Sequence, residues 1–311
     1  MKRIILLIIT FSLFNCNSTK NKSKKNSLEI INLTNSQLSL MNELENKDKI
    51  IRDSIFLKKI YSSNLELWNN YLGDENDFLK WLNNVSFPEL NLYQEKSKNL
   101  KLDELNEYFI ETSKKMKTFT GYEPKGKWYI VFGPKWTDAG GFGNGTMVLD
   151  LANSNNSLKH IKLIFPHELN HQIYSYTLPN FESVVLKRII NEGFATYVSY
   201  LFHNKETSIS QELQYSEEEL KTCIENEEKI LKLLKKHYKS NDKDIADLFA
   251  NRNYKIEKNF PGAIGYYIGF RIVEEFIKKN GKDSWKKIYK ITPEKVLEDS
   301  GILNSTLHKN V

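Results

Sequence analysis

The stretch that most constrains this chain is His167-Glu168-Leu169-Asn170-His171. In an α-helix over residues 163 to 175, His167 and His171 lie four positions apart on one face, so both imidazoles reach a single metal ion. Glu168 points about 100° further round the helix, beside the ion rather than on it. The spacing therefore predicts a metal-binding helix with a carboxylate next to the metal.

This spacing also predicts the role of each side chain. A His-Glu-x-x-His helix binds zinc through its two histidines, while its glutamate takes a proton from a zinc-activated water and later gives it to the leaving amine. We therefore expect His167 and His171 to be zinc ligands. Glu168 is expected to be the general base and then the general acid.

A catalytic zinc normally has three protein ligands and leaves a fourth position for water. Glu192 is the candidate for the third ligand, because twenty residues separate it from His171 and allow a loop and the start of a second helix. Gly193 has no side chain to keep these two helices apart. Pro166 leaves two possibilities: the first helix begins near Phe165, or it bends just before the ligands.

The motif, together with Asn191-Glu192-Gly193-Phe194-Ala195, resembles the gluzincins, metallopeptidases whose third zinc ligand is a glutamate on the following helix. The second run is especially similar to the zinc-binding helix of gluzincin aminopeptidases. Weaker similarity, at residues 128 to 152 and 262 to 277, links the chain to a bacterial family of proposed zinc-dependent proteases of unknown function. The resemblance implies a zinc peptidase. Exopeptidase activity is not implied, since the chain has no Gly-Ala-Met-Glu-Asn motif.

The same resemblance implies further site residues. Gluzincins place a hydrogen-bond donor for the oxyanion downstream of the ligands, which implies Tyr266 here, with Tyr267 as second choice. They also have a strand along the substrate backbone, and the strand at 146–151 is placed in sequence to bind a peptide in this way. Thr196 occupies the position of an aspartate in thermolysin-like relatives, so the partner that orients His167 is left open. A tyrosine packed between helices and an ordinary sheet strand are the alternatives.

The spacing of apolar residues predicts the fold class. Residues 28–120 show helical periodicity and are expected to form a helical lobe. Strands are expected at 128–132 and 146–151, and one long amphipathic helix at 211–238. The expected fold is α+β and mostly helical, with a zincin-like catalytic domain containing a small sheet over 121–311.

The first residues resemble a bacterial lipoprotein signal. A basic start and a short apolar run up to Phe14 suit a secretory signal and are too short to span a bilayer. Cys16 is then expected to carry the lipid. It follows a signal peptide over 1–15 and is the first residue of a flexible basic tether over 16–27. An ordinary signal peptide or an uncleaved anchor is the alternative. The lipoprotein interpretation predicts attachment to a membrane of the bacterial cell envelope, on its periplasmic or cell-surface side.

The formal net charge of +6 does not predict a nucleic-acid partner, because four lysines lie in the expected tether and acidic and basic residues alternate elsewhere. The expected partners are a peptide or protein substrate and the membrane. With Cys16 acylated, Cys223 has no partner in the chain, so packing must stabilise the fold. The sequence does not predict an oligomeric state.

These observations favour a lipid-anchored, zinc-dependent peptidase. The alternative is a catalytically inactive zinc-binding or scaffold lipoprotein of the cell envelope. A degenerate site would be expected to lose its base before its ligands, and Glu168 is present.

Overall fold

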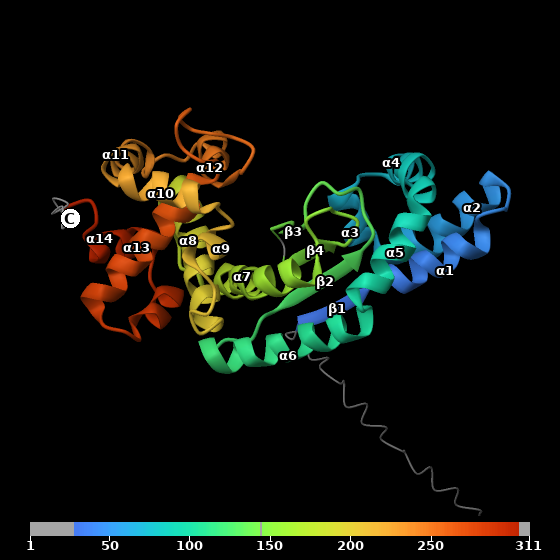
Figure 1. Cartoon of the computed structure of the whole chain (residues 1–311), viewed down its shortest axis with the longest axis horizontal. Helices are drawn as coiled ribbons and strands as arrows, with labels where there is room; N and C mark the ends of the chain where they lie inside the picture. Colours follow the sequence, from blue (N-terminus) through green and yellow to red (C-terminus); the bar gives the residue numbers. More distant parts are fainter. Residues whose placement is uncertain (1–27, 144, 305–311) are drawn as a thin grey trace, which may run out of the picture.

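The computed structural model describes residues 28–143 and 145–304. The expected signal peptide, the lipidated Cys16 and the tether lie outside these residues. Within the described part of the chain, none of the helices has the length and apolarity that a membrane crossing requires. The fold is α+β and mostly helical, as predicted, with one small mixed sheet (Figure 1).

The sheet has the strand order β1-β2-β4-β3. β1 and β4 both pair with β2 in parallel, and β3 pairs with β4 antiparallel. The strands are β1 (Leu28–Asn32), β2 (Gly126–Val131), β3 (Ala139–Gly141) and β4 (Thr146–Asp150). The two predicted strands correspond to β2 and β4.

Two expectations about the sheet are wrong. The segment predicted to be helical begins with β1, because Leu28–Asn32 pair with the edge of β2. The second wrong expectation is that the strand at 146–151, which is β4, lies along the backbone of a peptide substrate. β4 has β2 on one side and β3 on the other, and all five of its residues are buried. The free edge next to β4 belongs to β3 instead.

Helices α1 to α6 follow β1 and cover one end and one side of the sheet (Figure 1). Their aromatic side chains pack together, with the rings of Trp68 and Phe78 at 5.2 Å. Tyr93 stacks on Phe132 at 4.7 Å, just after β2. The helices are α1 (Thr34–Leu44), α2 (Lys49–Phe56), α3 (Leu65–Tyr71), α4 (Glu75–Trp81), α5 (Leu90–Leu100) and α6 (Leu102–Thr120). A division of the chain near residue 120 stays a prediction.

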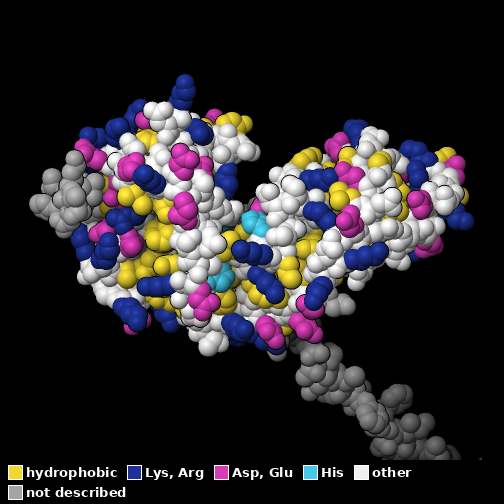
Figure 2. Space-filling view, viewed as in Figure 1, with side chains coloured by type: hydrophobic (Ala, Val, Ile, Leu, Met, Phe, Trp, Pro, Cys, Tyr) yellow, Lys and Arg dark blue, Asp and Glu magenta, His cyan; other side chains and the backbone are white. Residues whose placement is uncertain are grey.

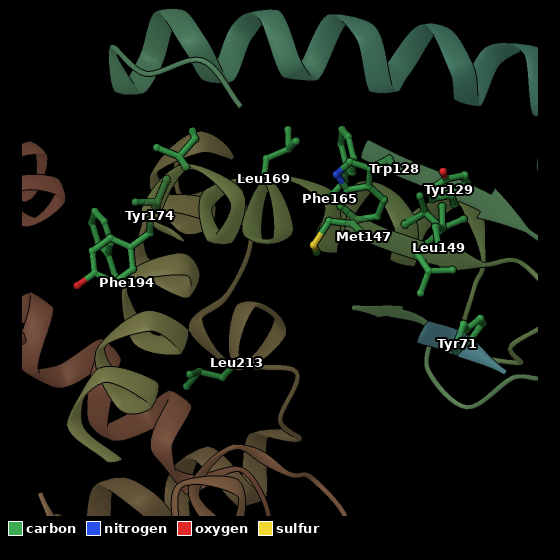
Figure 3. Packing of buried hydrophobic residues seen from close by; sticks show 14 of the residues in the cluster. Tyr71, Trp128, Tyr129, Met147, Leu149, Phe165, Leu169, Tyr174, Phe194 and Leu213 are labelled. Atoms are coloured by element: carbon green, nitrogen blue, oxygen red, sulfur yellow. The ribbon is translucent and has the colours of Figure 1, made fainter. Parts of the chain in front are cut away.

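The remaining helices form the other half of the molecule, and α7 runs from the sheet toward them (Figure 1). Phe165 of α7 packs on Trp128 of β2 at 5.1 Å, and Tyr174 of α7 meets Phe194 of α8 at 5.4 Å (Figure 3). These helices are α7 (Leu158–Thr177), α8 (Val184–Phe202), α9 (Ile209–Leu213), α10 (Glu217–Glu225), α11 (Glu227–His237), α12 (Lys243–Ala250), α13 (Ile264–Asn280) and α14 (Pro293–Ser300).

The single long helix expected at 211–238 is three helices, α9, α10 and α11. Ser208 and Ser216 each begin a helix with a capping box, in which the serine side chain accepts a hydrogen bond from the third helical residue. Gln214 ends α9 in the left-handed conformation, with φ 52°. The apolar spacing continues across these boundaries, so periodicity alone did not predict them.

Helix α7 begins at Leu158, so the expectation of a start near Phe165 is wrong. Ser157 caps the helix by accepting a hydrogen bond from the His160 amide. Pro166 lies inside the helix and has no N–H to offer the Lys162 carbonyl one turn earlier. The Tyr108 hydroxyl of α6 donates to this carbonyl at 2.9 Å. The helix therefore continues through the proline to the two histidines.

Gly193 was expected to let α8 approach α7, but it faces α13. A Cβ added to Gly193 would lie 1.9 Å from the carbonyl carbon of Gly269, and one added to Gly269 would lie 2.0 Å from the Ile189 oxygen. Backbones meet here with no room for a side chain. This contact fixes α8 against α13 at the turn that carries Glu192.

Candidate metal centre

Helices α7 and α8 bring together the three predicted ligands, His167, His171 and Glu192. His167 Nε2 and His171 Nε2 are 3.0 Å apart. Glu192 Oε2 lies 3.6 Å from His167 Nε2 and 3.2 Å from His171 Nε2. Donors bound to a tetrahedral zinc at about 2.0–2.1 Å are about 3.3 Å from one another. The three atoms therefore have the spacing of three corners of a zinc tetrahedron.

Glu192 provides an independent sign that a cation fits here. Its side chain is only 4% exposed. Its Oε2 atom accepts no hydrogen bond within the described residues, although it faces both imidazoles. A buried carboxylate oxygen costs free energy unless a nearby positive charge compensates it, here either a protonated imidazole or a metal ion. A metal ion bound by Oε2 and the two Nε2 atoms would remove this cost.

Neighbouring polar groups hold the ligands in place. Asn191 Oδ1 lies 3.1 Å from His171 Nδ1, so an Nδ1–H donated to it leaves the lone pair on Nε2 for a metal. Arg188, one turn before Glu192, places its Nε 3.4 Å from Glu192 Oε1. Thr196 donates to the backbone oxygen of Glu192 and does not orient His167.

The charges of the group support one another. Burial alone would raise the pKa of Glu192, but His171, His167 and Arg188 outweigh burial and hold it well below its ordinary value. Burial alone would lower the pKa of His171, but the Glu192 carboxylate outweighs burial and raises it to about 9. Without metal, the site is therefore an imidazolium–carboxylate pair. A divalent cation would replace the proton.

Glu168 follows His167 on α7 and is partly buried. Burial raises the pKa of its carboxyl group, and the positive charges of His171 and His167 oppose this increase. A raised pKa brings a carboxylate closer to the range in which it can both accept and release a proton at neutral pH.

The structure distinguishes the two candidate tyrosines. The Tyr266 ring is parallel to that of His167, with an interplanar angle of 4° and centroids 5.8 Å apart. Burial, followed by the charge of Glu192, raises the pKa of Tyr266 well above its ordinary value, so its hydroxyl stays protonated. The Tyr267 hydroxyl instead donates to Glu227 Oε1 at 3.3 Å. Only Tyr266 belongs to the group around the predicted ligands.

The molecule is hollowed between its two halves, and histidine atoms are visible at the base of the hollow (Figure 2). Three residues near the ligands were not predicted from the sequence, namely Arg188, Asn191 and Arg252. Asn191 and Arg188 could have been found by placing Glu192 on a helix and looking at its preceding turn. Arg252 carries no local signal, because it reaches Tyr266 from a loop after α12.

The fold and this group together define a mostly helical α+β protein with a buried His-His-Glu site that could hold a metal ion. The chain belongs to the family described as Predicted Zn-dependent protease (DUF2268), which matches it over residues 101–298. The matched region contains α7, α8 and α13, and thus every candidate residue of the metal centre. Comparisons with curated proteins and with solved structures gave no match.

Proposed function

We propose that this protein is a gluzincin-type zinc peptidase that hydrolyses peptide bonds at the cell envelope. The observation that carries the proposal is the spacing of His167 Nε2, His171 Nε2 and Glu192 Oε2, between 3.0 and 3.6 Å. Glu168 follows His167 on α7. A zinc ion held there supplies the Lewis acidity that makes water nucleophilic near neutral pH. Membership of a family of predicted Zn-dependent proteases supports the same activity.

The roles of the residues follow from their chemistry. Glu168 takes a proton from the attacking water and passes it to the leaving amine, which its raised pKa favours. Tyr266 keeps its hydroxyl proton and donates a hydrogen bond to the oxyanion of the tetrahedral intermediate. Asn191 and Arg188 position His171 and Glu192.

The substrate backbone would pair with β3, the edge strand. Phe142 N donates to Thr146 O, and Asp150 N donates to Asp138 O. The main-chain groups of Ala139 and Gly141 therefore face away from β4. The Ala139 carbonyl already accepts a hydrogen bond from the Thr137 hydroxyl, and the Ala139 N–H already donates one to the Asp138 carboxylate. The main-chain groups of Gly141 are therefore the ones that an extended peptide could pair with. Asp138 also pairs with His160 of α7 at 2.8 Å, which ties this edge to the metal helix.

The lipid anchor is part of the same proposal and rests on the sequence around Cys16. An acylated Cys16 followed by a basic tether would keep the enzyme at a membrane of the cell envelope, near envelope peptides or proteins. Labelling cells with a radioactive fatty acid tests it, because Cys16→Ala should abolish incorporation into this protein.

Replacing Glu168 by glutamine tests the catalytic role. We expect Glu168→Gln to retain one zinc per chain and to lose at least about a hundredfold in peptide hydrolysis, the usual contribution of a general base. Elemental analysis and digestion of a broad peptide library measure the two quantities. Wild-type protein treated with a chelator and then reloaded with zinc is the control.

Hydrolysis by Glu168→Gln at the wild-type rate would contradict the mechanism. Zinc retention without hydrolysis by the wild-type protein would favour the alternative, a catalytically inactive zinc-binding lipoprotein.

A further inference from the structure

A pocket of about 660 Å³ lies beside the metal centre, between α8, α12 and the loop that follows α12. Pockets of this size hold small ligands or a few side chains of a peptide. It is lined by Arg188, Asp244, Asp247, Leu248, Arg252 and Tyr254, together with Ala250 and Asn251.

Two arginines connect this pocket to the metal centre. Arg188 has its Nε 3.4 Å from Glu192 Oε1, and its side chain is 46% exposed and lines the pocket. The guanidinium carbon of Arg252 lies 4.7 Å from the centre of the Tyr266 ring. Tyr266 in turn stacks on His167. A ligand on Arg188 is thus one side chain away from Glu192, and a ligand on Arg252 is two side chains away from His167.

Arg252 is incompletely paired. Its Nη1 donates to the backbone oxygen of Gln214 at 3.3 Å. Its Nη2 has no hydrogen-bond partner in the described residues and almost no exposed surface, and the guanidinium carbon lies 4.7 Å from the centre of the Tyr266 ring and 5.8 Å from that of Tyr215. Pairing with a ligand therefore requires the side chain to turn toward the pocket. A Cβ on Gly262 would lie 2.0 Å from the Arg252 oxygen, so the returning loop presses against this residue. An unpaired N–H of a buried cation is costly, and a carboxylate is its strongest partner.

The two aspartates of the pocket do not provide this partner. Asp244 and Asp247 are exposed on α12, and neither forms an ion pair with Arg188 or Arg252 in the part of the chain that the structure describes. Exposed carboxylates stay hydrated and are screened by salt. The Asp244 and Asp247 carboxylates therefore weaken the attraction of the pocket rim for an anion, but they do not accept a hydrogen bond from Arg252.

We propose that this pocket binds a carboxylate of the peptide substrate, paired with Arg252 and attracted by Arg188. The planar guanidinium group can bind both oxygens of a carboxylate at once. The carboxylate is either the side chain of an acidic residue near the scissile bond or the free C-terminus of a short peptide. This inference rests on the proposed function, since it assigns the substrate class of the same site.

Calorimetric titration of the zinc-loaded Glu168→Gln protein tests the proposal, because bound peptides should remain uncut. Three matched peptides are compared: one with an internal Glu and an amidated C-terminus, one with Gln and a free C-terminus, and one with Gln and an amidated C-terminus. We expect at least one carboxylate peptide to bind about tenfold more tightly than the third. Which of the first two binds more tightly identifies the source of the carboxylate.

Variants in the same background link the preference to the pocket. Arg252→Gln should abolish the preference, and Arg252→Lys should retain part of it. Asp247→Asn, an exposed substitution that leaves the arginines in place, should increase the preference. Lys187→Gln is the matched control and should change nothing, because Lys187 Nζ lies 4.4 Å from the centre of the Phe181 ring and does not line the pocket.

Equal affinity for all three peptides, no binding of any peptide, or no increase with Asp247→Asn would overturn the proposal. Hydrolysis of the library by the wild-type protein would leave the peptidase function intact in those cases. Carboxylate-dependent binding by a protein that cleaves no peptide would support the pocket and contradict the peptidase.

Discussion

His171 links the predicted metal chemistry to pH. The Glu192 carboxylate raises the pKa of His171 to about 9 in the metal-free site. A raised pKa means that the ion pair stabilises the metal-free fold fully below the ordinary value of about 6.5 and that this stabilisation is lost as the pH rises through 9. Zinc needs the neutral imidazole and therefore competes with this proton.

We expect the apparent affinity for zinc to increase roughly tenfold per pH unit between about pH 7 and 9, and then to level off. Competition with a chelator of known proton affinity measures it across this range. An affinity that does not change with pH between 7 and 9 would contradict the pairing of His171 with Glu192.

The residues of the site differ in how far the sequence could predict them. Helical spacing predicts His167, Glu168 and His171. The need for a third ligand, the separation from His171 and the resemblance of the local run together predict Glu192. Tyr266 required a choice between two adjacent tyrosines, because the register of α13 against α8 is set by packing. Arg252 could not be predicted, since its position depends on the path of a loop.

At the scale of helices, the contact between Gly193 and Gly269 holds α8 in position. A Cβ at Gly269 would lie 2.0 Å from the Ile189 oxygen and 2.9 Å from Gly193 Cα, so α8 and α13 would have to separate. We expect Gly269→Ala to lower the free energy of unfolding by about 3 kcal/mol and to weaken zinc binding, because Glu192 moves with α8. Thermal unfolding and zinc content measure the two effects.

Gly140→Ala is the matched control, because its nearest neighbour would be Thr137 Oγ1 at 3.5 Å, an ordinary contact. Unfolding temperatures and zinc contents of Gly269→Ala equal to those of the wild-type protein would contradict the importance of this contact.

Helix boundaries show why local patterns were insufficient. The proline rule offered a start near Phe165 or a bend just before the ligands. The start is wrong, because α7 begins at Leu158, and the bend stays a prediction. Tyr108 of α6 supplies a hydrogen bond to the Lys162 carbonyl from 54 positions away. Ser208 and Ser216 begin new helices within a continuous apolar pattern, through capping boxes that were present in the sequence. Long-range contacts could not be predicted, whereas the caps could have been.

At the scale of the whole molecule, the sheet joins the two halves. In the sequence, β1 comes before helices α1 to α6, and β2 comes after them. The two strands pair in the sheet. Phe109 of α6 packs on Phe165 of the metal helix at 4.5 Å. The sequence predicted a mostly helical chain and the strands β2 and β4, but neither β3 nor β1 and its pairing with β2, because a five-residue strand before a long helical region has a weak signal.

We expect a fragment of residues 121–304 to lack a cooperative unfolding transition, because it would expose the β2 edge and the apolar side chains that α1 to α6 cover. The chain of residues 28–304 should unfold in one transition. Circular dichroism during heating compares the two. A fragment that unfolds cooperatively would show instead that the division near residue 120 separates independent domains.

Zinc content tests the central claim most directly. We expect the purified wild-type protein to contain about one zinc per chain, and His167→Ala, His171→Ala and Glu192→Ala each to lose most of it while remaining folded by circular dichroism. Elemental mass spectrometry after dialysis measures the ratio. A wild-type protein that binds no zinc when offered it, or a Glu192→Ala variant that retains the wild-type amount, would contradict the account.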